Sequence, residues 1–175
     1  MELRTAVSPR DVKHYTTERL REEFLISNLF PADEIRLVYS HIDRIITGGI
    51  MPVQKTLVLT AGEELRAQYF LERREMGVIN IGGKGTVTVD GKSYDLDFQE
   101  ALYVGRADEK NNKEIVLTSK DPANPAKFYM NSACAHQSFP TKKVTLKEAN
   151  NIKAGSLKES NDRVIHQLII NGVAG

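Results

Sequence analysis

The sequence predicts an all-β protein built around a small barrel, with a short helical extension at the N-terminus. Three observations support this: alternating apolar residues in the centre of the chain, a tight-turn signal between two such runs, and further short strand candidates on both sides. The alternation is clearest within residues 78–104, for example at Val87 and Val89. A period of two is expected of strands that bury one face. Asp90-Gly91 then supplies the positive φ angles that a tight hairpin turn requires.

Before this central hairpin, the sequence predicts one helix and several strands. Leu20 and Phe24 recur at helical spacing within residues 17–26, and Thr16 or Thr17 can cap the helix. The segments that follow are expected to be strands at 35–40 and 42–46, a turn at Gly48-Gly49, a strand at 51–60 and extended structure at 68–73.

After the hairpin, strands are expected at 114–118 and 127–131, with a loop containing proline and asparagine at 120–125. Residues 145–148 have the spacing of a capping box and predict one helical turn. Residues 164–170 alternate well enough for a final strand. Strands and turn signals that recur at this density are typical of an all-β barrel or sandwich.

The composition limits the possible functions. A chain of 175 residues is long enough for one domain with a real core. The net charge of +1 gives no indication of binding to nucleic acid or to an anionic membrane. We expect neither a membrane span nor a secretory signal, because the apolar runs are short and the N-terminus has no apolar core. A single cysteine, Cys134, fits a reducing cytosol and is expected to be a small buried filler.

One segment matches part of a barrel motif. Barrels of the cupin type often carry the pattern G-x5-H-x-H-x(3,4)-E-x6-G, whose histidines and glutamate hold a metal. Here Glu75 and Gly82 match the end of that pattern. The histidine positions would fall on Gln68 and Phe70, or on the residue after each, and none of these binds zinc or iron well. The sequence therefore predicts a cupin-like barrel that lacks a metal at the usual position.

The other candidate motifs have structural explanations that we favour. The glycine cluster at 82–85 is followed by a strand instead of a helix, so a barrel corner is expected and not a nucleotide loop. None of the four histidines pairs with another at a metal-binding spacing, although a site from distant strands with Glu72 or Glu75 stays open. These histidines are His14, His41, His136 and His166.

The charged clusters of the chain can each have a functional or a structural role. Strand alternation would place His41 and Asp43 on one face, as a tuned acid–base pair or, as we favour, a hydrogen-bonded cluster. The run Glu72-Arg73-Arg74-Glu75 is expected to be an ion-paired strand edge or a subunit contact. Binding of a sugar-acid carboxylate is its alternative. The same two alternatives apply to Lys142-Lys143.

Four long segments together resemble one family, the 4-deoxy-L-threo-5-hexosulose-uronate ketol-isomerases of bacterial pectin breakdown. The resemblance extends over nearly the whole chain, and its most specific parts are YSHIDRII-x-GGI-x-P and YFLERRE-x-GVINIGG. The segments are RLREEFLISNLF at 19–30, VYSHIDRIITGGIMPV at 38–53, YFLERREMGVINIGGKGTVTVDGKSYDLDFQEALYVG at 69–105 and PAKFYMNSACAHQSFPTKKVT at 125–145.

The resemblance implies a cytoplasmic enzyme that interconverts 5-keto-4-deoxyuronate and 3-deoxy-D-glycero-2,5-hexodiulosonate. It also implies a bicupin, with two barrels in one polypeptide, commonly assembled as a homo-oligomer, with a hexamer as the expected form. The zinc site of that family consists of three histidines and a glutamate in the C-terminal barrel. This chain contains no H-x-H, so no zinc ligand can be assigned to any of its residues.

The chain is therefore expected to be the N-terminal half of such a bicupin. The expected divisions are a helical extension at 1–30, a metal-free cupin-like barrel at 31–150, and a linker and strand at 151–175 that lead toward a second barrel absent from this chain. Candidates for contact with the substrate carboxylate are His41, Arg44, Arg74 and Lys143.

Two other functions remain open. A metal-free cupin could be a non-catalytic module for sugar-acid binding or for oligomerisation. Metal-independent isomerisation by His41 and Asp43 is the less favoured possibility.

Overall fold

The computed structural model describes residues 1–108 and 114–174. Its helices are α1 (Pro9–Val12), α2 (Thr17–Phe24) and the 3-10 helix η1 (Leu157–Glu159). Its strands are β1 (Glu2–Arg4), β2 (Glu34–Ser40), β3 (Ile46–Met51), β4 (Leu57–Leu59), β5 (Arg74–Asn80), β6 (Gly85–Val89), β7 (Lys92–Leu96), β8 (Ala101–Val104), β9 (Ile115–Ser119), β10 (Phe128–Cys134), β11 (Lys142–Val144), β12 (Asn150–Ala154) and β13 (Arg163–Gln167).

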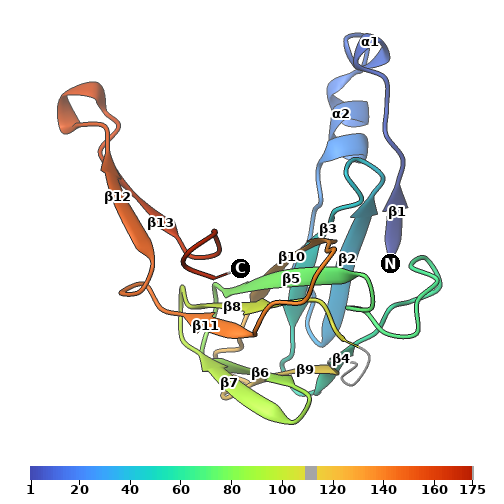
Figure 1. Ribbon diagram of the computed structural model, residues 1–175. Helices are drawn as coiled ribbons and strands as arrows, with labels where there is room; N and C mark the ends of the chain where they lie inside the picture. The colour runs from blue at the N-terminus through green and yellow to red at the C-terminus, as the bar shows by residue number, and fades with distance from the viewer. Residues whose placement is uncertain (109–113, 175) are drawn as a thin grey trace.

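Two sheets face each other and form the barrel (Figure 1). The larger has seven strands in the order β1-β2-β3-β10-β5-β8-β11, and the smaller has four in the order β4-β9-β6-β7. Neighbouring strands are antiparallel except β1 and β2, which are parallel. The β12–β13 hairpin forms a separate two-stranded sheet that extends away from the barrel.

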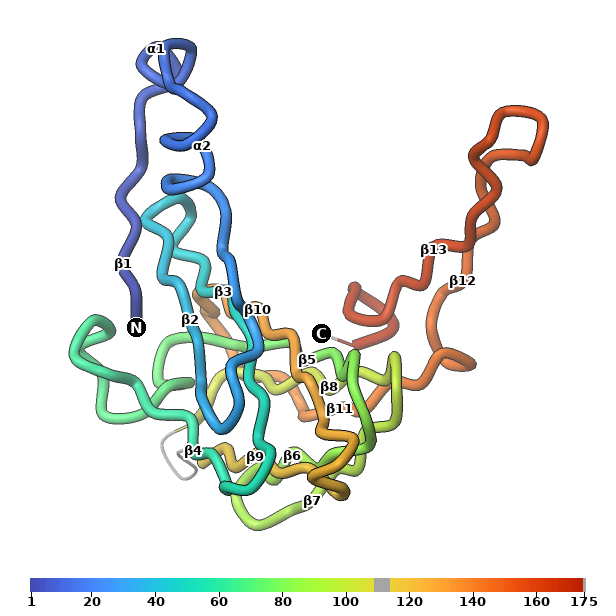
Figure 2. The backbone as a smooth tube through the Cα atoms, turned by 180° about the vertical axis from the view of Figure 1, so that it is seen from behind, coloured from blue at the N-terminus to red at the C-terminus, as the bar shows by residue number. Residues whose placement is uncertain are grey.

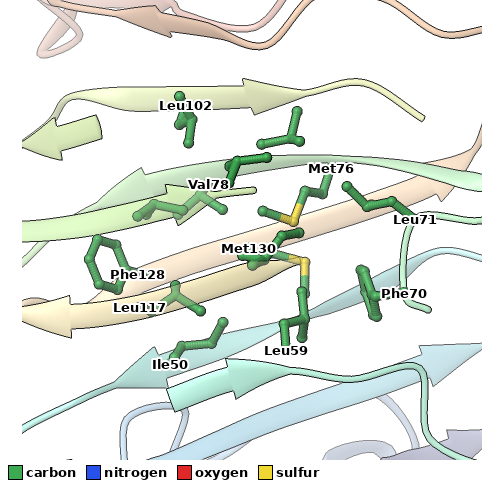
Figure 3. Close-up of a cluster of buried hydrophobic side chains, with 14 of the residues drawn as sticks. Ile50, Leu59, Phe70, Leu71, Met76, Val78, Leu102, Leu117, Phe128 and Met130 are labelled. Carbon is green, nitrogen blue, oxygen red and sulfur yellow. The ribbon is translucent and has the colours of Figure 1, made fainter. Parts of the chain in front are cut away.

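The main core lies between the two sheets (Figure 3). Strand alternation turns Met76 and Val78 of β5 inward, together with Phe128 and Met130 of β10. The four-stranded sheet contributes Leu117 from the opposite side, and the exposed fraction of each of these five side chains is 2% or less. Burial of such side chains stabilises the fold by about 1.5–3 kcal/mol each.

The central prediction of the sequence is confirmed. Residues 78–104 form most of four strands, β5 to β8, and Asp90-Gly91 makes the turn between β6 and β7 with φ angles of 47° and 76°. The glycines at 82–85 form the corner that takes the chain from one sheet to the other. Strands predicted at 35–40, 114–118 and 127–131 are also present, within one to three residues.

The structure contradicts the strand expected at 42–46 and the turn expected at Gly48-Gly49. Asp43 and Arg44 have φ angles of 52° and 54°, so the chain turns there, and β3 begins only at Ile46. The two glycines lie inside β3. Position 48 requires glycine because a Cβ there would come within 2.0 Å of the Arg36 carbonyl oxygen. A Cβ on Gly49 would similarly meet a backbone carbonyl at 2.2 Å. Glycine serves here for close approach, not for a turn.

Three further segments also differ from the prediction. Of residues 51–60, only Leu57–Leu59 forms a strand beyond the end of β3, because Pro52 cannot donate to a sheet ladder. Residues 68–73 form turns and bends, not extended structure. The final strand ends at Gln167 because residues 168–174 turn back against the seven-stranded sheet, where Leu168 and Ala174 are buried.

The predicted helix is confirmed as α2, capped by Thr16, whose hydroxyl accepts a hydrogen bond from the Arg19 N–H at 3.3 Å. Helices α1 and α2 and the β12–β13 hairpin form two arms that rise on either side of the barrel (Figure 2). The sequence did not predict α1, β1, β11 or β12. No helix in the described part of the chain is long and apolar enough to cross a membrane.

Candidate functional site

The candidate site is a cavity of about 170 Å³ at one end of the barrel. Strands β2, β5 and β10 contribute inward-facing side chains to it, and the loops at 41–45 and 61–73 complete its wall. Its lining residues combine three arginines with aromatic, apolar and thiol side chains. They are Tyr39, Arg44, Leu65, Ala67, Phe70, Arg73, Arg74 and Cys134. We call this the barrel-mouth cavity.

Arg74 is the central residue of the barrel-mouth cavity. It begins β5 in the same phase as Met76 and Val78, so alternation turns its side chain into the barrel, where 4% of it is exposed. Its Nε donates to the Ser132 hydroxyl at 3.1 Å, and its Nη2 donates to the Ser132 carbonyl at 2.9 Å. Nη1 donates to the Cys134 Sγ at 3.5 Å. The guanidinium is thereby fixed in one orientation.

The charge of Arg74 has no carboxylate counterpart among the described residues. Its hydrogen-bond acceptors are neutral: a hydroxyl, a thiol and the carbonyls of Ser132 and Arg44. Burial lowers the pKa of Arg74 from its ordinary value, and nearby Arg44 acts in the same direction. Arginine nevertheless stays protonated in proteins. The cavity therefore contains a buried, uncompensated positive charge, which is costly to maintain.

Two neighbours complete the environment of this charge. The Arg74 guanidinium lies 5.5 Å from the centroid of the Tyr39 ring, a cation–π contact. Arg44 reaches the cavity from the turn between β2 and β3, and no ion pair involves its side chain within residues 1–108 and 114–174. Arg73 is less available, because it is 3.5 Å from Glu72 and donates to two carbonyls in the 61–73 loop.

The structure brings together two of the four predicted carboxylate contacts. Arg44 and Arg74 line the same cavity. His41 is exposed beside it, with its ring 5.5 Å from that of Tyr39 in an edge contact. Lys143 lies elsewhere, on β11, where it forms an ion pair with Glu100 at 2.6 Å.

Several other expectations need correction. His41 and Asp43 lie in a turn and not on one face of a strand, and no hydrogen bond joins them within the described residues. The run at 72–75 is not a strand edge, because β5 lies between β10 and β8. Its ion pair is Arg73 with Glu72, while Arg74 turns inward. Cys134, expected as a buried filler, is half-buried in the cavity wall.

The outer face of the seven-stranded sheet carries a second polar group that the sequence analysis missed. The Tyr103 hydroxyl donates to Glu75 at 2.6 Å. Burial, followed by this hydrogen bond, raises the pKa of Tyr103, so the hydroxyl stays a donor. Both residues line an outer cavity of about 360 Å³ beside Gly77 and Ile169. Alternation along β5 and β8 could have predicted that this pair lies on the outer face. Glu75 and Tyr103 are out of phase with the inward-facing Met76 and Leu102.

The described residues do not fit a zinc site. Within residues 1–108 and 114–174, no three side chains among histidine, cysteine, aspartate and glutamate gather where they could hold a metal. The positions expected for cupin ligands include Phe70 and Leu71, which are buried in the apolar core. His166 instead hydrogen-bonds Asn151 within the hairpin at 2.6 Å.

Comparison with solved structures defines the fold class. An IolB-like protein of Salmonella typhimurium LT2 superimposes with a TM-score of 0.53 at 12% sequence identity, over 71% of this chain and 44% of that chain. At this identity the similarity establishes the fold alone. The chain is an all-β protein of cupin-like fold, as the sequence predicted.

Comparison of sequences then defines the family. Residues 24–174 match the KduI/IolB family, and the chain belongs to it. It is 59% identical over 172 residues to a 4-deoxy-L-threo-5-hexosulose-uronate ketol-isomerase of Lachnoclostridium phytofermentans, covering 98% of this chain and 61% of that protein. A protein of the same name from Escherichia coli is 50% identical over 175 residues, with coverage of 99% and 62%. The chain thus spans about three fifths of these relatives' length.

Proposed function

We propose that this chain belongs to a ketol-isomerase that interconverts 5-keto-4-deoxyuronate and 3-deoxy-D-glycero-2,5-hexodiulosonate in uronate breakdown. The observation that carries the proposal is the 59% identity, over 98% of the chain, to a relative named as a ketol-isomerase. The resemblance of the sequence to the same family of pectin-degrading enzymes supports it. We further propose that the enzyme acts in the cytoplasm.

The chemical step is proposed to take place outside these residues. Ketol isomerisation moves a hydrogen between a carbonyl carbon and the neighbouring hydroxyl-bearing carbon, which requires a positioned acid–base group. Neither a histidine nor a carboxylate is among the described residues that line the barrel-mouth cavity. Because the described residues do not fit zinc either, the zinc expected of this family is proposed to lie in a part of the enzyme that the chain does not cover.

The test is a chimera. The part of the Lachnoclostridium relative that this chain does not match is joined to the 175-residue chain, and both proteins are assayed for conversion of 5-keto-4-deoxyuronate by NMR. We expect turnover and about one bound zinc in the chimera, and neither in the chain alone. A folded chimera that leaves the substrate unchanged, beside an active Lachnoclostridium enzyme, would refute the proposal.

The second candidate function is that of a non-catalytic module, either for sugar-acid binding or for oligomerisation. One observation favours each of these two roles. The uncompensated Arg74 suits binding of an acid. Exposed apolar side chains on the N-terminal helices and on the β12–β13 hairpin suit assembly. Examples are Phe24, which is 51% exposed, and Leu157, which is 84% exposed. The proposed assembly is a homo-oligomer, with a hexamer as the expected form. Sedimentation measures the number of chains in it. A monodisperse monomer would exclude it for this chain.

A further inference from the structure

We propose that the barrel-mouth cavity is a metal-independent binding site for the carboxylate of a small sugar acid, with Arg74 and Arg44 as its anion-binding residues. Binding of an anion follows from the charges in the cavity. Only the identification of that anion as a uronate rests on the proposed function.

The first argument is the state of the Arg74 charge. A buried cation is expected to have a carboxylate partner or to bind an anion, since desolvation is expensive. Arg74 has neither among the described residues, and four neutral acceptors hold it in place. A guanidinium has five N–H donors, so one N–H of Nη1 is left to donate to a ligand. Donors that are already fixed bind an anion with little further loss of entropy.

The second argument is that like charges converge on the cavity. Arg44 and Arg74 line it together, close enough for Arg44 to lower the pKa of Arg74. Glu72 pairs with Arg73 at 3.5 Å, and within residues 1–108 and 114–174 no ion pair involves Arg44 or Arg74. An anion between Arg44 and Arg74 would replace repulsion with two charge-assisted hydrogen-bonding partners.

The third argument is the size and the wall of the cavity. Its volume of about 170 Å³ is below the 300–1,000 Å³ that is usual for drug-sized ligands. It therefore suits a carboxylate with a few attached carbons, such as one end of a sugar acid. Phe70, Leu65 and Ala67 offer apolar surface to those carbons, and Tyr39 offers a ring face and a hydroxyl.

Cys134 provides a direct readout of occupancy. It is the chain's single cysteine and its Sγ lies 3.5 Å from the Arg74 guanidinium in the cavity wall. A ligand on Arg74 should shield this thiol. The experiment measures the rate at which a disulfide reagent labels Cys134 with increasing D-glucuronate, with D-glucose as the uncharged control and sodium chloride at equal ionic strength.

The key variant is Arg44→Asn, because asparagine tolerates the positive φ of 54° at that position while removing the charge. Its matched control is Arg66→Asn. Arg66 is an exposed arginine with a φ of 45° in the neighbouring loop, and it does not line the cavity. We expect D-glucuronate to protect Cys134 in the wild type and in Arg66→Asn. In Arg44→Asn, protection should need at least about tenfold more ligand, corresponding to about 1.4 kcal/mol.

The outcomes separate the site from its ligand. Protection by D-glucose equal to that by D-glucuronate, no protection at all, or equal weakening by both variants would each overturn the proposal. Equal protection by acetate and D-glucuronate would support the anion site and overturn the sugar-acid assignment. Failure of the chimera to isomerise its substrate would leave this labelling result unchanged, so the two proposals fail independently.

Discussion

The two faces of the seven-stranded sheet are packed differently. On the inner face, Val78, Leu102 and Met130 are fully buried against the four-stranded sheet. On the outer face, Ile79 is half-buried, and residues 168–174 cover only part of the surface, leaving cavities of about 360 and 390 Å³. The difference teaches that the chain completes its own barrel interior but covers the back of the same sheet only in part. Mutations on the two faces should therefore have unequal costs.

Truncation of the inner core should have the largest effect. Phe128→Ala removes a fully buried ring that packs between the two sheets. We expect a loss of about 3–5 kcal/mol in the free energy of unfolding, measured by urea denaturation. Phe98→Ala is the matched control, because that ring is 59% exposed and should cost less than about 0.5 kcal/mol. Similar costs for both would contradict the described core.

The same substitution, made once in β6 of the four-stranded sheet toward the inner core and once on the outer face of the seven-stranded sheet, sharpens the comparison. A Cβ on Gly85 would come within 2.5 Å of both Ala126 and Phe128 in the inner core, so Gly85→Ala should cost about 1–3 kcal/mol. A Cβ on Gly77 would meet only the flexible end of Ile169. Gly77→Ala should therefore cost less than about 1 kcal/mol. Thermal unfolding of both variants checks the order, and the reverse order would show that the outer face is the more tightly packed.

A smaller effect is expected from the polar pair on the outer face. Tyr103→Phe removes the hydroxyl that donates to Glu75 while keeping the ring, and should cost about 1 kcal/mol in urea denaturation. Tyr94→Phe is the control, because the Tyr94 hydroxyl has no hydrogen-bond partner within the described parts of the chain. Equal stability of Tyr103→Phe and the wild type would mean that water replaces the hydroxyl.

The smallest effect should appear in the pH dependence of stability. One Asp33 oxygen accepts hydrogen bonds from the N–H groups of Val53, Gln54 and Lys55, on the connection between the two sheets. The hydrogen bond from Lys55 is the main cause that holds the pKa of Asp33 below its ordinary value. A lowered pKa in the folded state gives stability above the unfolded pKa of about 3.9, which is lost as the pH falls through the folded value.

Asp33→Asn should therefore show a shallower decline in stability between pH 6 and pH 2 than the wild type. Asparagine suits the positive φ of 58° at this position, so backbone strain should not change. The free energy of unfolding measured across this range tests the expectation, with Asp162→Asn in the exposed hairpin as control. Parallel pH profiles for the wild type and Asp33→Asn would rule out the role given to these hydrogen bonds.

The site was only partly predictable from the sequence. Arg74 and Arg44 could be named as carboxylate contacts, and the phase of Arg74 with Met76 and Val78 already indicated an inward side chain. The absence of a carboxylate around Arg74 could not be foreseen, because Ser132 and Cys134 approach it from a strand 58 and 60 residues away. Lys143 was indistinguishable in sequence from a free cation, and only the fold pairs it with Glu100.

Local chemistry let the sequence determine the all-β class, a helix cap at Thr16 or Thr17, and the hairpin at Asp90-Gly91. These features depend on residues that are neighbours along the chain, and so does the alternation that selects the inner face. The tertiary structure alone decided that Gly48-Gly49 lies inside a strand, since the carbonyls that exclude a Cβ there come from other segments. It also decided which arginines share a cavity, because the groups that surround a buried charge come from segments that are distant along the chain.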